Sequence, residues 1–262
     1  MELLTFDSFV KASISKRPSK HIKSPYVADI IIDDNEYLGH TPALGCCGLS
    51  ESGCDVFVSK MSGANTKCDY RINVALIKDK GVDRLVGIAP KLAEEIASNA
   101  LKNGLINGLL VGKLAREKKI LNSRFDFVGE TVDKIPFVLE VKNVPLAKEI
   151  NGNKYSYFPD GYRKKKGDTI SERALKHVQE LEKIKLSNNT IRCVLLFVIQ
   201  RTDVDWFEIY KDDPIYLDAV REAWMSGVEI KTLQVEWDIT GKCRFYSNTL
   251  PVILYDDCNL DL

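Results

Sequence analysis

Two short predicted strands that carry charges among apolar residues place the tightest constraint on this sequence. Residues 123–128 and 136–143 both alternate aromatic or β-branched side chains with polar ones, and turn residues separate them. Two adjacent strands of this pattern hold Asp126, Glu140 and Lys142 close together on an otherwise apolar sheet. Charges in such a place cost free energy unless they bind something, so we expect a ligand there.

The strand alternation also assigns the apolar side chains. Phe125 and Phe127 are expected to share one face of the first strand, with Asp126 on the other face. Gly129 is expected in the gap between the strands.

A hard divalent cation is the simplest ligand for these acids. The carboxylates of Asp126 and Glu140 and the backbone carbonyl of Val141 suit Mg²⁺, or Mn²⁺, because Mg²⁺ takes few protein ligands and keeps several waters. Lys142 points the same way as Glu140 and is placed to activate a water or to stabilise charge on phosphorus. The alternative is an exposed strand with a cross-strand ion pair.

Several further motifs follow in order along the chain. They are Phe158-Pro159-Asp160, the run Ser171-Glu172-Arg173-Ala174-Leu175-Lys176-His177 and the run Leu196-Phe197-Val198-Ile199-Gln200-Arg201. Together with Ser123-Arg124-x-Asp126-Phe127 and Glu140-Val141-Lys142-Asn143, they resemble the SfsA family (sugar fermentation stimulation protein A). The resemblance runs from about Arg116 to Pro251 and is faint before that.

The resemblance implies an α+β fold in two domains. Members of this family are described as nucleic-acid-binding proteins that join an OB-like N-terminal domain to a PD-(D/E)xK nuclease-like domain. We therefore expect a small OB-like β-barrel over residues 1–87 and a nuclease-like α/β domain over residues 88–262, with a mixed central sheet flanked by helices. The strand pattern changes to a helix pattern near Pro90, which agrees with this boundary.

The resemblance and the helix pattern also suggest contacts to nucleic acid. Glu117 corresponds to a glutamate that precedes the family's Ser-Arg-x-Asp motif, and it is either a third catalytic carboxylate or a surface residue. A helix begins after Ser171, and Arg173 and His177 lie one turn apart on its polar face. The predicted nucleic-acid contacts near the acids are Ser123, Arg124, Asn143, Arg173, His177 and Gln200.

Two basic segments are further candidates for phosphate contacts. Residues 8–28 contain no acid, and their basic side chains form either an arm along a phosphate backbone or a solvated loop. The second segment, Arg163 to Lys166, is either a phosphate-binding loop or a solvated loop tip. The predicted contacts here are Lys16, Arg17, Lys20, Lys23, Arg163, Lys164, Lys165 and Lys166.

Composition limits the other possibilities. The 37 basic and 37 acidic residues balance, so any nucleic-acid surface has to be local. Seven cysteines at irregular spacing favour free thiols over disulfides or a zinc site, and hence an intracellular, cytoplasmic protein. No apolar run reaches membrane-spanning length, so no membrane partner is expected.

Two functions remain. The first is a metal-dependent nuclease that hydrolyses phosphodiester bonds in DNA or RNA, with Asp126 and Glu140 binding Mg²⁺ and Lys142 activating water. The alternative is a nucleic-acid-binding regulatory protein on a nuclease-like fold with little or no catalysis. The intact acids favour the nuclease, because a binder without chemistry has no need of clustered acids facing phosphates.

Overall fold

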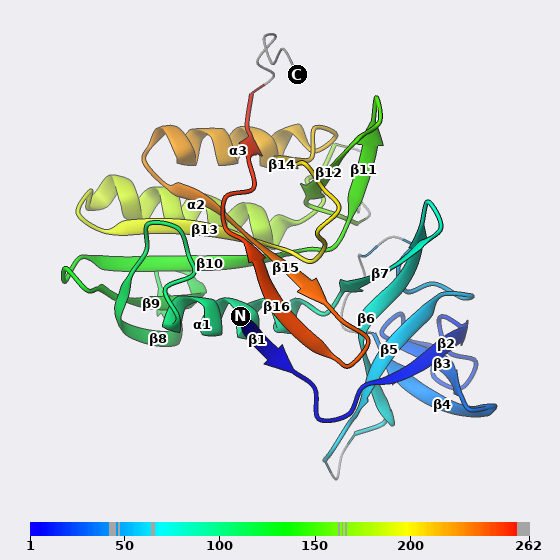
Figure 1. Ribbon diagram of the computed structural model, residues 1–262. Helices are drawn as coiled ribbons and strands as arrows, with labels where there is room; N and C mark the ends of the chain where they lie inside the picture. Colours follow the sequence, from blue (N-terminus) through cyan, green and yellow to red (C-terminus); the bar gives the residue numbers. More distant parts are fainter. Residues whose placement is uncertain are drawn as a thin grey trace.

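Three β-sheets and three helices make up the described part of the chain (Figure 1). The computed structural model describes residues 1–41, 46, 48–63, 66–161, 163, 165 and 167–255. The strands are β1 (Glu2–Thr5), β2 (Val10–Lys16), β3 (Val27–Ile32), β4 (Asn35–His40), β5 (Asp55–Lys60), β6 (Tyr70–Asp79), β7 (Val82–Gly87), β8 (Val111–Ile120), β9 (Ser123–Thr131), β10 (Pro136–Val144), β11 (Ala147–Ile150), β12 (Asn153–Phe158), β13 (Arg192–Ile199), β14 (Trp206–Ile209), β15 (Glu229–Trp237), β16 (Lys242–Ser247) and β17 (Val252–Ile253). The helices are α1 (Pro90–Lys102), α2 (Glu172–Ser187) and α3 (Pro214–Met225).

The largest sheet has seven strands in the order β1-β16-β15-β13-β10-β9-β8. Its centre is parallel, because β13 pairs in parallel with both β10 and β15, and its outer strands are antiparallel. Residues 193–199 of β13 are all fully buried, as a continuous apolar run at the middle of a parallel sheet requires. The predicted α+β class with a mixed central sheet flanked by helices is confirmed.

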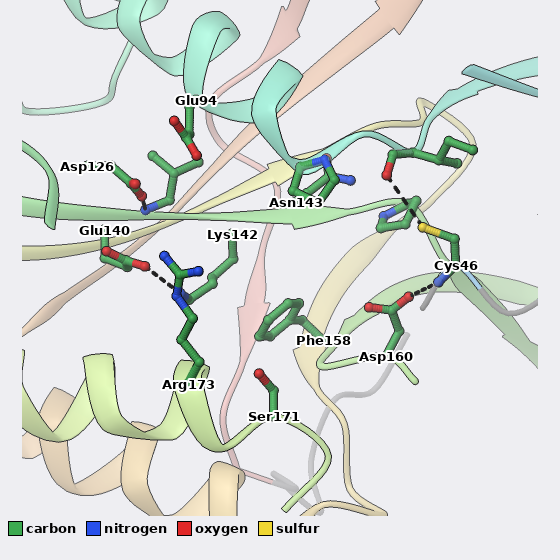
Figure 2. A pocket seen from close by; sticks show the side chains of 14 residues that line it. Cys46, Glu94, Asp126, Glu140, Lys142, Asn143, Phe158, Asp160, Ser171 and Arg173 are labelled. Carbon is green, nitrogen blue, oxygen red and sulfur yellow. Dashed lines mark hydrogen bonds and ion pairs between the residues drawn. The ribbon is translucent and has the colours of Figure 1, made fainter. Parts of the chain in front are cut away.

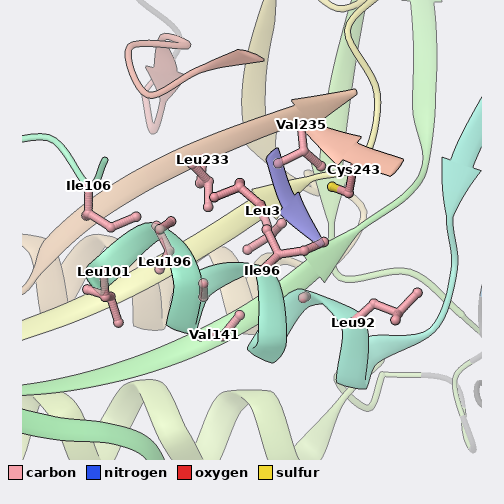
Figure 3. Packing of buried hydrophobic residues seen from close by; sticks show 14 of the residues in the cluster. Leu3, Leu92, Ile96, Leu101, Ile106, Val141, Leu196, Leu233, Val235 and Cys243 are labelled. Carbon is pink, nitrogen blue, oxygen red and sulfur yellow. The ribbon is translucent and has the colours of Figure 1, made fainter. Parts of the chain in front are cut away.

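Helices cover both faces of this sheet (Figure 1). Helix α1 packs Leu92, Ile96 and Leu101 against β-strand residues such as Val141 and Leu196 on one face (Figure 3). Helices α2 and α3 form the crossovers that parallel strands need and share a second apolar cluster on the opposite face. The predicted helix starts are confirmed: Pro90 is the first residue of α1, and the Ser171 hydroxyl caps α2 by accepting from the Ala174 N–H at 3.2 Å.

The N-terminal sheet has six strands in the order β4-β3-β2-β5-β6-β7. Strand β4 also pairs in parallel with β6, through Gly39 with Tyr70 and His40 with Arg71, and this pairing closes a ring of five strands. The apolar cluster inside it includes Ile14, Ile30 and Ile72, all nearly or fully inaccessible to solvent. A third sheet, β11-β12-β14-β17, lies beside the larger one.

Two corrections apply to the N-terminal region. The interval predicted for the first domain, residues 1–87, includes β1, but β1 pairs with β16 in the seven-stranded sheet. The predicted basic arm is not a free arm either, because Val10–Lys16 forms β2 inside the ring and pairs with β3 and β5. Ala12 and Ile14 form the buried face of that strand and alternate with polar residues, which is the strand pattern that the prediction of an arm overlooked.

The prediction that Phe125 and Phe127 share a face is wrong. Phe125 packs in the cluster under α2, whereas Phe127 packs in the cluster under α1. The β8–β9 ladder pairs Lys118 with Phe125 and Arg116 with Phe127, and Glu117 between them has a left-handed backbone with φ 53°. Glu117 thus lies opposite Asp126, at the point of β9 where the two phenylalanines diverge to different clusters.

No helix within the described ranges combines the length and the apolar character that crossing a membrane demands.

The packing around Gly129 in β9 leaves no room for a side chain. It lies within the strand rather than in the turn, and a Cβ there would meet the carbonyl oxygen of Lys113 and come 2.8 Å from the ring of Phe137. We expect Gly129→Ala to lower the free energy of unfolding by about 1–3 kcal/mol, because the strand pair has to shift. Urea denaturation measures this effect.

The neighbouring Glu130→Ala is the control for Gly129→Ala. The Glu130 side chain forms an ion pair with the exposed Lys113 at 3.0 Å and no other within the described ranges, so its loss should cost well under about 1 kcal/mol. Equal stability of the two variants would show that the close approach at Gly129 carries no cost.

Candidate active site

The site begins where the β9–β10 ladder ends. The last pair of that ladder is Leu139 with Phe127, and one more step would place Glu140 opposite Asp126. Instead, the Asp126 Oδ2 atom accepts a hydrogen bond from the backbone N–H of Val141 at 2.7 Å. The other edge of β10 stays paired with β13 as far as Val144. One edge of residues 140–143 is thereby left open.

A cavity of about 310 Å³, here called the carboxylate cavity, lies against this open edge (Figure 2). Four consecutive residues of β10 line it, as expected where a strand presents its backbone edge. Helix α1 contributes from one side, and the segment that starts α2 contributes from the other. Its lining residues are Cys46, Ile88, Pro90, Glu94, Asp126, Glu140, Val141, Lys142, Asn143, Pro145, Phe158, Asp160, Ser171 and Arg173.

Glu140 is the most enclosed acid in the cavity, with 3% of its surface exposed. Its Oε1 atom accepts from Lys142 Nζ at 2.6 Å and contacts His177 Nδ1, whereas Oε2 is buried without a partner among the described residues. Burial alone would raise the pKa of Glu140, but the charge of Lys142 and the hydrogen bond to His177 outweigh it, so this pKa is lowered. Glu140 is therefore a fixed anion with one oxygen unused.

The pKa of Asp126 is shifted in the opposite direction to that of Glu140. Burial, and then the neighbouring charge of Glu140, raise the pKa of Asp126 from 3.8 to about 7. The Val141 N–H and Lys142 oppose this rise without cancelling it. A cation beside the two acids would favour the ionised form of Asp126, which burial and the charge of Glu140 disfavour.

Glu94 is a third acid in the cavity, and the sequence analysis missed it. It projects from α1 toward Asp126 (Figure 2), and burial raises its pKa. Its partner is Arg116, whose Nη2 atom lies 3.8 Å from Glu94 Oε2. The α1 sequence offered only the signal of an amphipathic helix, in which Glu94 falls among the polar residues.

A chain of amide groups fixes the orientation of Asn143. Trp237 Nε1 donates to Gln200 Oε1 at 2.8 Å, and Gln200 Nε2 donates to Asn143 Oδ1 at 2.8 Å. An indole N–H can only donate, so it sets which end of each amide is the oxygen. The Asn143 Nδ2 group donates one N–H to the Gly87 carbonyl at 3.4 Å, and its second N–H is the donor that lines the cavity.

Gln200 and Glu117 lie outside the cavity. Gln200 is fully buried, so it can influence a ligand only through Asn143. Glu117 is exposed, and its carboxylate pairs with the guanidinium of Arg124. The sequence could not show that Trp237, 94 positions after Asn143, completes this chain of amides.

The residues of α2 and β9 that were predicted to contact nucleic acid line a neighbouring depression of about 450 Å³, here called the cationic depression. Arg173 lines both this depression and the carboxylate cavity. The residues that line the cationic depression are Asn122, Ser123, Arg124, Glu172, Arg173, Lys176 and His177.

The described residues of the two basic segments line neither hollow. The Lys20 ammonium pairs with Glu36 at 2.6 Å, and the Arg17 guanidinium donates to the Ser50 carbonyl at 3.1 Å, whereas Lys16 and Lys23 are exposed. In the second segment Arg163 and Lys165 are exposed, and Lys164 and Lys166 lie outside the described residues.

The cysteines of the described residues are not paired in disulfides. Cys46, Cys54, Cys68, Cys193 and Cys243 are free thiols. Over the same part of the chain, no group of three or more His, Cys, Asp and Glu side chains gathers as a metal cage. A cation in the carboxylate cavity would therefore use few protein side chains.

Comparisons with known proteins identify relatives of the chain and of its fold. Residues 91–241 match the family model described as the sugar fermentation stimulation protein RE domain. The chain is 34% identical over 204 residues to a sugar fermentation stimulation protein homolog of Clostridium botulinum, covering 77% of this chain and 81% of that protein. A homolog from Clostridium perfringens is 32% identical and covers 84% and 87% respectively. The structure of Pyrococcus furiosus SfsA in complex with Ca²⁺ has a similar fold, with a TM-score of 0.77 at 20% identity over 97% of this chain and 99% of that one.

The raised pKa of Asp126 predicts a pH-dependent stability. Between the unfolded value of 3.8 and the folded value of about 7, the unfolded chain is ionised while the folded one holds the proton, so stability falls as pH rises and levels off above 7. The total loss is on the order of 4 kcal/mol, and Asp126→Asn removes it while keeping the acceptor for the Val141 N–H. Urea denaturation in EDTA should show that the advantage of the variant grows from pH 5 to pH 8.

Asp133→Asn is the control for this measurement, because Asp133 is exposed in the β9–β10 turn. It should follow the wild-type pH profile. If the stability of Asp126→Asn changed with pH in parallel with that of wild type, the raised pKa of Asp126 would be contradicted.

Proposed function

Because the chain belongs to the sugar fermentation stimulation protein (SfsA) family, we propose that it is a metal-dependent nuclease that hydrolyses phosphodiester bonds in DNA or RNA. The observation that carries the proposal is the pair Asp126 and Glu140 at the open end of the β9–β10 ladder, with Lys142 beside it. Buried acids in this arrangement repel a phosphate unless a cation lies between them and the phosphate.

The residues of the carboxylate cavity fit a divalent cation. Glu140 Oε2 is buried and unused among the described residues, and the ionised form of Asp126 is disfavoured until a positive charge joins it. Val141 donates its N–H to Asp126, and a residue's N–H and C=O point to the same edge of a strand, so its carbonyl is a third oxygen ligand. Two carboxylates and a carbonyl suit Mg²⁺ or Mn²⁺.

The Ca²⁺ complex of the related Pyrococcus furiosus protein supports an oxygen-preferring cation for this fold. When bound, Mg²⁺ or Mn²⁺ would act as a Lewis acid on the phosphoryl group. The carbonyl of Val141 and the carboxylates of Asp126 and Glu140 would hold it.

The chain's own residues have separate tasks in this proposal. Lys142 is 9% exposed and fixed by Glu140, so its ammonium is positioned at the cavity to orient the attacking water and to stabilise negative charge on phosphorus. Asn143 presents an N–H donor and Arg173 a guanidinium to the phosphoryl oxygens. His177 acts through Glu140, whose orientation its Nδ1 helps to fix.

The N-terminal ring of strands is the proposed OB-like nucleic-acid-binding part. The ring order β2-β3-β4-β6-β5, in which β5 pairs back with β2, supports a five-stranded Greek-key barrel. Such barrels bind nucleic acid with basic and aromatic side chains. The exposed side chains of Lys16 and Lys23 support this role.

One observation favours the alternative of a binding protein without turnover. Glu140 Oε1 already contacts both Lys142 and His177, so the protein's own side chains use one of its two oxygens and balance its charge. In a protein that binds nucleic acid without cleaving it, Glu140 would stay paired with Lys142 and His177 and would bind no metal ion. Catalysis instead requires the Glu140 oxygen that remains unused.

Lys142→Met separates these functions. It keeps the length and the apolar contacts of the side chain but removes its charge, so we expect cleavage of labelled DNA or RNA with Mg²⁺ or Mn²⁺ to fall by roughly two to four orders of magnitude. Binding of the same oligonucleotide should persist. Lys183→Met, an exposed lysine on α2, is the matched control and should cleave like wild type.

Equal cleavage by the Lys142→Met variant and wild type would refute the mechanism. Binding by both proteins with no cleavage by either would establish the non-catalytic alternative.

Metal binding depends on Asp126 in this proposal. Calorimetry with Mn²⁺ above pH 7 should show that Asp126→Asn loses at least about tenfold in affinity, because a neutral amide replaces a carboxylate ligand. Asp133→Asn should bind Mn²⁺ as wild type does. Unchanged affinity in a folded Asp126→Asn protein would remove Asp126 from the metal site.

A further inference from the structure

The cationic depression beside the carboxylate cavity has the charge balance of an anion site. Three basic side chains, Arg124, Arg173 and Lys176, line it against the single acid Glu172. Arg124 is held by Glu117, and Lys176 Nζ donates to the Asn122 carbonyl at 2.8 Å. Arg173 forms no hydrogen bond or ion pair within the described ranges, so its guanidinium is the available cation.

The start of α2 adds to this potential. The helix runs for 16 residues from Glu172, and its first turn forms one wall of the depression. The positive end of a helix dipole favours an anion within the first turn. This feature alone does not define a site.

An independent observation comes from Ser123 on β9. It is 4% exposed, lines the depression, and its Oγ atom is buried with no hydrogen-bond partner in the described part of the chain. A buried hydroxyl without a partner costs free energy, so such a group calls for an explanation. A ligand oxygen that accepts the Ser123 hydroxyl proton provides one.

We infer that the cationic depression is a phosphate-binding subsite separate from the cleavage position. A phosphate accepts hydrogen bonds on several oxygens at once, which suits a guanidinium, an ammonium and a hydroxyl converging from two elements. Arg173 lines both hollows, so one side chain can contact a phosphate in each. The subsite itself does not depend on the proposed function. The identity of its phosphate does, because a nucleic-acid strand offers either the next internal linkage or a terminal phosphate.

Inorganic phosphate tests the subsite without any assumption about nuclease activity. In EDTA, titration of nitrogen-15-labelled wild type should shift the Arg173 Nε–H and Ser123 amide resonances in a saturable way. Arg173→Gln and Ser123→Ala should each weaken phosphate binding about tenfold or more, because each loses a hydrogen bond to a charged group. Lys183→Gln, the exposed cation further along α2, should bind as wild type does.

Arg173 is exposed, so its substitution leaves folding intact even if Ser123→Ala is destabilised. No saturable shift in wild type would overturn the subsite. Equal weakening by Lys183→Gln and Arg173→Gln would also overturn it, because the effect would then be one of general charge.

Oligonucleotides then identify the source of the phosphate. Binding in EDTA is compared for 5′-phosphorylated and 5′-hydroxyl forms, and for strands with one linkage replaced by a neutral methylphosphonate. The subsite is supported if wild type loses about tenfold in affinity for only one of these altered oligonucleotides and Arg173→Gln shows no such loss. The oligonucleotide concerned then shows whether the subsite binds a terminal or an internal phosphate. Equal losses in both proteins would overturn it. Binding of inorganic phosphate without any oligonucleotide binding would support the subsite and refute the proposed function.

Discussion

The early end of one β-ladder is the constraint on which the rest of the site depends. After Leu139 pairs with Phe127, β9 and β10 separate, and the side chain of Asp126 takes the hydrogen bond that a neighbouring strand would have supplied to Val141. The left-handed backbone at Glu117 lies opposite the same point. A fully paired ladder would bury this edge in backbone hydrogen bonds, so the cavity exists because the pairing stops.

The two acids at this edge are kept in different states by different neighbours. Glu140 is surrounded by Lys142 and His177, which hold it as an anion despite its burial, whereas Asp126 is buried beside the charge of Glu140 and is only partly compensated by the Val141 N–H and Lys142. Burial, and then the charge of Glu140, therefore raise the pKa of Asp126. A divalent cation placed between them would stabilise the ionised Asp126 without displacing Lys142, because Glu140 has a separate oxygen free among the described residues.

The sequence predicted the parts of this structure that depend on local pattern. The strands around Asp126 and Glu140, the apolar run of β13 and the Ser171 cap follow from alternation, burial and hydrogen-bonding rules that act over a few residues. Features that depend on distant partners were missed. Glu94 looks like a polar helix residue until α1 packs beside β10, and the β1–β16 pairing joins residues more than 200 positions apart. No local signal encodes such contacts.

The same long-range contacts explain why the two predicted parts share one site. The backbone N–H of Cys46 donates to Asp160 at 2.6 Å at one wall of the carboxylate cavity. At another, Gly87 lies so close to Gln200 and Trp237 that a side chain there would displace the amide chain that orients Asn143. Phe57 and Val74 of the N-terminal sheet also pack in the apolar cluster of α1. The wall of the carboxylate cavity is therefore built from both parts of the chain, and Asn143 keeps its orientation only while these long-range contacts hold the parts together.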